Sequence, residues 1–228
     1  MCARILAALA LLAAEDSAGG RIAVHVDPRI ELLTAVARLA GFDEFNQSNS
    51  ASPYATEVEK QFGPFREHAA VARLKELRES SGVSYDAIAS LAVHLDGLPG
   101  LSERAPFDGP LERLDARWGG AKARDFLVEL REFVAASHAV EFFDSHRAFY
   151  AEVERRLGER LSQSQAIPWF DSFFGARPEA RYTAVPGLLC GGGNYGVGVR
   201  FPDGLPEEIT PVFGCWKTKI SKRSIACA

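Results

Sequence analysis

The chain has 228 residues, of which 47% are apolar and 25% charged, as is typical of one or two globular domains. This composition excludes disordered acidic tails, collagens and coiled coils. The net charge of −4 does not indicate binding to phosphates, so no nucleic-acid partner is expected.

The first residues form a segment of their own. Arg4 is followed by the apolar run Ile5–Ala14, which is too short to cross a bilayer and is typical of a secretory signal peptide. We expect residues 1–19 to be that signal, and the protein to be secreted or periplasmic with no membrane span. A short buried N-terminal helix is the alternative.

The next part of the chain is rich in helix signals. Alternating apolar residues predict a strand over 22–26, and Asp27 followed by Pro28 predicts the start of a helix that ends at Gly41. Apolar spacing predicts further helices, with Ser84 as the N-cap of the third. Their expected ranges are 54–62, 65–79, 85–95, 122–136 and 138–161.

The chain changes character after about residue 166. Glycine, proline and β-branched residues predict short strands near 181–185, 197–201 and 209–215. The expected fold is therefore α+β, a single domain over residues 20–216 with a helical N-terminal two thirds and a small sheet in the C-terminal third. The aromatic side chains of Trp169, Phe170, Phe173 and Phe174 are more typical of a core than of a binding surface.

The histidines do not indicate a metal site. None of the five begins an HExxH motif. His138 and His146 would lie on one side of the same expected helix, but about 12 Å apart, which is too far to share a zinc ion. A GxSxG motif is also absent, so we assign no catalytic or metal-binding residue.

Three cysteines follow the expected signal peptide: Cys190, Cys215 and Cys227. Export permits disulfides, and the candidate pair is Cys190–Cys215. Free buried thiols are the alternative.

The segment GGGNYG over 191–196 lacks the ending of a phosphate-binding loop. Glycines there would let another backbone approach closely, as at a sheet edge that accepts a peptide. An ordinary glycine-rich turn is the alternative.

The last twelve residues are atypical. The chain has six lysines, and Lys217, Lys219 and Lys222 fall in this tail, which contains no acidic residue. We interpret residues 217–228 as a tail that a frameshift could have produced. Without it, the net charge would be nearer −8.

Several segments together resemble a family of exported bacterial proteins, domain of unknown function family 4932. They are 26–46, the turn at His68, 81–95, 191–196 and 211–216. The resemblance implies a metallopeptidase-like fold in which a zinc-binding HExxH helix follows a strand similar to 209–216. It also implies that a substrate-binding segment lies near the active site, here Gly191, Gly192, Gly193, Asn194 and Tyr195.

The resemblance implies a zinc ion for full-length members of the family. Because this chain has no HExxH, we expect no cofactor in it. Our first hypothesis is an inactive N-terminal part of such a peptidase, with a peptide or protein as partner. Its sheet would then expose an unpaired edge or an uncovered face, which lowers solubility. The alternative is a non-catalytic secreted helical binding module that uses the aromatic residues after 168. A different enzyme built on the helical carboxylates and histidines is disfavoured.

Overall fold

The computed structural model describes residues 22–47, 52–109, 114–164, 166–175, 179–202, 204–217 and 225–227. The expected signal peptide, residues 1–19, lies outside these ranges. Of the tail, Lys217 ends strand β4 and Ile225–Cys227 form strand β5, while 218–224 and 228 lie outside the described residues. No helix in the described ranges is long and apolar enough to span a bilayer.

The first strand and helix follow their local signals. Strand β1 (Ala23–Val24) leads to helix α1 (Pro28–Leu39), and the Asp27 side chain caps the helix by accepting the Arg29 backbone N–H at 2.9 Å. Gly41, just after the helix, has a φ of +81°, which glycine adopts without strain. Helix α1 is buried on nearly all sides and is the centre of the helical layer.

Three helices surround α1: α2 (Pro53–Phe62), α3 (Ala69–Ser81) and α4 (Asp86–Val93), with short 3₁₀ turns at Asp43–Phe45 and Gly63–Phe65. Helix α3 begins later than expected because this second 3₁₀ turn precedes it and the His68 ring then caps it, with Nδ1 accepting the Ala70 N–H.

The prediction that Ser84 caps helix α4 was wrong. Tyr85, not Ser84, occupies the N-cap position, and the Ser84 hydroxyl instead donates to the buried Glu44 carboxylate. The same carboxylate accepts two hydrogen bonds from Arg78, at 2.9 and 3.0 Å. Ser84 therefore serves a tertiary contact rather than the helix end.

The second helical block contains α5 (Gly120–Ala136), α6 (Ala139–Ser145), α7 (Arg147–Gln163) and α8 (Ala166–Phe174). The prediction of a single helix over 138–161 was wrong, because the helix is interrupted at His146, between α6 and α7. Its Nδ1 lies 2.8 Å from the Phe142 carbonyl oxygen, while its backbone N–H donates to Phe143 instead. The imidazole thus competes for the carbonyl that a continuous helix would use.

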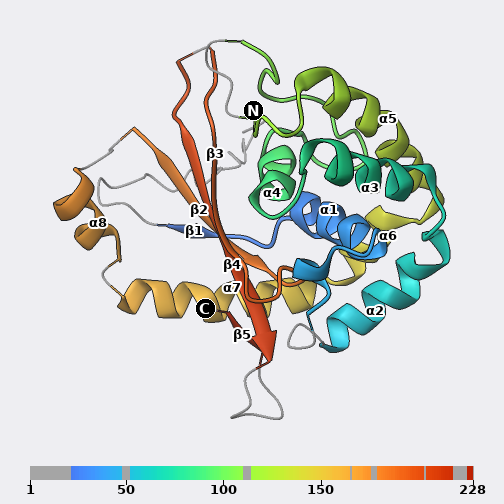
Figure 1. Cartoon of the computed structure of the whole chain (residues 1–228). Coiled ribbons are helices and arrows are strands. Elements are labelled where there is room, and N and C mark those ends of the chain that lie inside the picture. The colour runs from blue at the N-terminus through green and yellow to red at the C-terminus, as the bar shows by residue number, and fades with distance from the viewer. Residues whose placement is uncertain are drawn as a thin grey trace, which may run out of the picture.

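The sheet combines β1 with β2 (Arg181–Gly187), β3 (Asn194–Val199), β4 (Glu208–Lys217) and β5 (Ile225–Cys227) in the order β1-β2-β4-β3, with β5 also pairing β4. Strands β1, β2 and β4 are parallel, and β3 and β5 run antiparallel to β4. Helices α1 to α6 gather on one side of this sheet and α8 lies on the other (Figure 1). The α+β expectation is confirmed.

One hydrophobic core joins the two helical blocks and the sheet, from Val26 to Cys215. Within this core, the fully buried Trp118 donates its indole N–H to the Ala87 carbonyl at 2.7 Å. Not all aromatics join this core. Trp169 and Phe173 on α8 are 57% and 70% exposed, so the core expectation was wrong for these two. The side chains of Phe170 and Phe174 lie outside the description.

Candidate functional site

The glycine-rich segment forms the turn between β2 and the edge strand β3. Gly191 has a φ of +58°, and the carbonyl oxygens of Gly191 and Gly193 lie so close to Gly214 on β4 that a Cβ there would overlap both. The close backbone approach expected from the sequence is therefore made within the chain. It fixes the turn against the sheet.

The next two residues hold this turn. The Asn194 side-chain oxygen accepts the Gly214 N–H at 3.2 Å. Tyr195 is half-buried, packs on the core and brings its hydroxyl next to Gly193. Burial raises the pKa of the Tyr195 hydroxyl above its usual value. The segment that the resemblance implies for substrate binding, Gly191 to Tyr195, thus forms the turn before β3 and the first two residues of that strand.

The direction of the backbone groups of β4 follows from its pairing with β2. The Arg181 N–H donates to the Glu207 carbonyl at 2.8 Å, across a parallel pair in which Arg181 lies opposite Glu208. Odd-numbered residues of β4 therefore direct their N–H and C=O groups at β2, and even-numbered residues direct theirs at β3.

The backbone N–H and C=O groups of Gly196 and Gly198 point away from β4, at the free edge of the sheet. The residues of β3 opposite even-numbered residues of β4 are Tyr195, Val197 and Val199, and their backbone groups bond to β4. The N–H and C=O groups of the two glycines point to the other side, and among the described strands β3 pairs with β4 alone. This edge presents two donors and two acceptors in strand geometry.

A small cavity of about 170 Å³ lies beside this edge, between Gly196–Gly198 and helix α4. Asp86 and Ser90 of α4 line it together with Asp115. Arg117 bonds to both carboxylates, with its Nη2 at 2.7 Å from Asp115 Oδ2. This guanidinium holds the pKa of Asp115 below its usual value.

A buried acid lies behind the turn. Glu31 on α1 is fully buried, and its Oε1 accepts the Leu188 N–H at 2.9 Å. The Tyr54 hydroxyl interacts with the same carboxyl and opposes part of the effect of burial on its pKa. Burial raises the pKa of Glu31 to about 8, so the carboxyl is mostly protonated at neutral pH.

Two tyrosines and a cysteine surround this acid. The hydroxyls of Tyr54 and Tyr150 lie 2.8 Å apart, and burial followed by the nearby Glu31 charge raises the pKa of both. Cys190 Sγ lies 3.9 Å from the Thr34 hydroxyl. Helix α1 thus bonds to the turn through Glu31 and contacts it through Thr34.

The expected Cys190–Cys215 disulfide was wrong. Cys190 is a free buried thiol, whereas Cys215 is disulfide-bonded. Strand pairing places the backbone of Cys227 directly opposite Cys215. Burial raises the pKa of the Cys190 thiol, which disfavours the reactive thiolate.

We therefore expect Cys190 to resist alkylation in the native protein. Iodoacetamide labelling followed by peptide mapping should modify Cys190 only after unfolding in guanidinium chloride, and Cys215 only after reduction as well. Rapid labelling of Cys190 under native conditions would contradict this account, because a fully buried protonated thiol reacts slowly.

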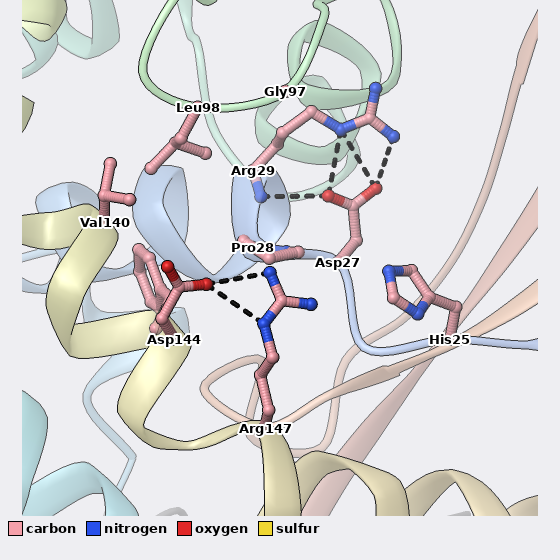
Figure 2. A pocket seen from close by; sticks show the side chains of 10 residues that line it. His25, Asp27, Pro28, Arg29, Gly97, Leu98, Val140, Asp144 and Arg147 are labelled. Carbon is pink, nitrogen blue, oxygen red and sulfur yellow. Dashed lines mark hydrogen bonds and ion pairs between the residues drawn. The ribbon is translucent and has the colours of Figure 1, made fainter.

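A second cavity, of about 310 Å³, opens beside the start of α1. Figure 2 shows two arginines on its walls, each held by an aspartate: Arg29 by Asp27 and Arg147 by Asp144. Leu98 adds an apolar wall. Each guanidinium is already neutralised by its aspartate, which weakens its attraction for an anion, so this cavity is the weaker candidate.

His25 lines the second cavity, and the other four histidines line neither of these two cavities. His146 bonds through Nε2 to Glu57 at 2.8 Å, and His138 precedes α6 with a φ of +51°. Within the described ranges, no three His, Cys, Asp or Glu side chains group closely enough to hold a metal ion. These residues do not fit the zinc site that the resemblance implies for full-length members.

Comparison with known proteins gives no relative. No family model, curated protein or solved structure matches the chain. Any function must therefore be argued from the site itself.

Sequence reasoning missed three parts of this site: Gly198, the acidic wall of α4 and the buried Glu31. The pattern G-x-G in a short strand was a usable signal for Gly198, since it leaves one face of the strand without side chains. Nothing in the local sequence marks Glu31 as buried.

Proposed function

We propose that this protein binds extended polypeptide segments along the free edge of β3 and does not hydrolyse them. On this proposal it is an exported protein and corresponds to the substrate-binding part of a metallopeptidase-like fold. The observation that carries the proposal is the outward direction of the N–H and C=O groups of Gly196 and Gly198. An extended peptide would bond to them as an additional strand.

The rest of the site supports this proposal. The turn that leads into β3 is held by its close contact with Gly214, by Asn194 and by the bond from Leu188 to Glu31, and these contacts constrain the edge without a ligand. A preorganised edge lowers the entropic cost of binding. The signal-like N-terminus supports export.

Substitution of Gly196 tests the edge directly. Proline there removes the outward N–H and places a ring at the edge, whereas alanine keeps the N–H and its Cβ meets no atom within 4 Å. For a fluorescein-labelled decapeptide rich in Thr and Val, we expect Gly196→Pro to weaken binding about tenfold and Gly196→Ala to change it little. Equal affinities for both variants in fluorescence anisotropy would contradict edge pairing.

Absence of hydrolysis is tested separately. Purified protein incubated with casein and added zinc should release no more peptide than buffer does, because the sequence has no HExxH. Cleavage that a chelator abolishes would contradict the non-catalytic part of the proposal.

Helix α8 supports a second candidate, a protein-binding surface on the other side of the sheet. Trp169 and Phe173 stack with ring centroids 5.6 Å apart and are both largely exposed. Such aromatics often anchor interfaces. In the same peptide-binding assay, loss of affinity in Trp169→Ala/Phe173→Ala but not in Gly196→Pro would favour this surface over the edge of β3.

A further inference from the structure

We propose that the groove beside β3 selects extended peptides that carry a lysine or arginine side chain. This inference rests on the proposed function, because it concerns the same edge. The groove is the free edge of β3 together with the cavity lined by Asp86, Ser90 and Asp115.

The cavity lies where a side chain of a bound peptide would point. A peptide paired with Gly196 and Gly198 would continue the sheet, and its successive side chains would alternate between the two faces. Helix α4, whose first two turns carry Asp86 and Ser90, packs against β3 on one of these faces, the one where α1 to α6 gather (Figure 1). Side chains on that face therefore meet the cavity, and those on the other face do not.

The charges of the cavity are unbalanced. Two carboxylates, Asp86 and Asp115, face one guanidinium, that of Arg117. Arg117 occupies both oxygens of Asp115 but bonds to only one oxygen of Asp86. The Asp86 side chain is 50% exposed, so its second oxygen can accept a hydrogen bond from a ligand.

A cationic side chain would complete this cluster. An ammonium or guanidinium group from the peptide would balance the excess negative charge and donate to Asp86, whereas a glutamate side chain would add a third carboxylate. The same charges thus favour basic peptides and disfavour acidic ones.

Three labelled decapeptides test the selection, identical except for Lys, norleucine or Glu at one central position. At low salt, the Lys peptide should bind about fivefold more tightly than the norleucine peptide, and the Glu peptide more weakly than both. The preference should shrink as salt is added. Norleucine matches the apolar stem of lysine and so isolates the charge.

Two variants locate the effect. Asp86→Asn should reduce the preference for Lys to less than about twofold, because it removes the excess negative charge. Asp125→Asn makes the same change in net charge on the exposed face of α5 and should leave the preference intact. Circular dichroism checks that both variants are folded, and the three peptides test selection on the unchanged protein as well.

The outcomes separate the two proposals. Equal affinities of the three peptides, all weakened about tenfold in Gly196→Pro, would overturn selection for basic residues while edge binding stands. A preference for Lys that Asp125→Asn reduces as much as Asp86→Asn would also overturn it. No binding of any peptide would overturn the proposed function itself.

Discussion

Replacing Glu31 by glutamine should make the protein more stable above pH 7 and remove much of its pH dependence. Glu31 is fully buried, and its pKa of about 8 lies above the ordinary value of 4.5. The folded state therefore binds a proton more tightly than the unfolded state does. Stability from this group is greatest below pH 4.5, falls as pH rises from 4.5 to about 8, and is constant above that.

The slope in that window is at most about 1.4 kcal/mol per pH unit, so the total loss is of the order of 5 kcal/mol. Glutamine keeps an oxygen to accept the Leu188 N–H but cannot ionise. Urea unfolding at pH 5, 7 and 8.5 measures the effect, and the exposed Glu67→Gln provides a matched control. The same pH slope in Glu31→Gln and in the unchanged protein would contradict the buried protonated carboxyl.

Adding a methyl group at Gly214 should both destabilise the fold and weaken peptide binding. A Cβ at this position would overlap the backbone oxygens of Gly191 and Gly193, and backbone cannot move aside as a flexible side chain can. We expect Gly214→Ala to cost about 1–3 kcal/mol in the free energy of unfolding. Because the turn precedes β3, its displacement should also misplace Gly196.

Gly97→Ala is the control for this substitution, since a Cβ at Gly97 meets no atom within 4 Å. Urea unfolding and the decapeptide assay measure the two consequences. A Gly214→Ala protein as stable as Gly97→Ala would show that the turn is not packed against β4 in the described way.

The helical layer was largely predictable because its signals are local. The Asp27–Pro28 pair and Gly41 mark the two ends of α1, and the structure places a capped helix between them. The break at His146 was not predictable, because it depends on a side chain that competes for one carbonyl. Ser84 was misread for a similar reason, since its partner Glu44 lies forty residues away.

The site was predictable only in outline. The glycine-rich segment indicated a place of close backbone approach, and the structure has one, but between Gly191, Gly193 and Gly214 of the same chain. Which glycines face outward depends on the strand pairing, which is a property of the assembled sheet. Glu31 lies on a helix that is buried on nearly all sides, so no polar face in the sequence marks its environment.

Backbone amide exchange of β3, measured by NMR with and without the Lys decapeptide, tests the central claim most directly. In the protein alone, the amides of Tyr195 and Val197 should exchange slowly and those of Gly196 and Gly198 quickly, because only the first two bond to β4. Peptide at saturation should slow Gly196 and Gly198 by about tenfold or more. Unchanged exchange at both glycines, with protection appearing at α8 or at the second cavity instead, would contradict peptide binding at this edge.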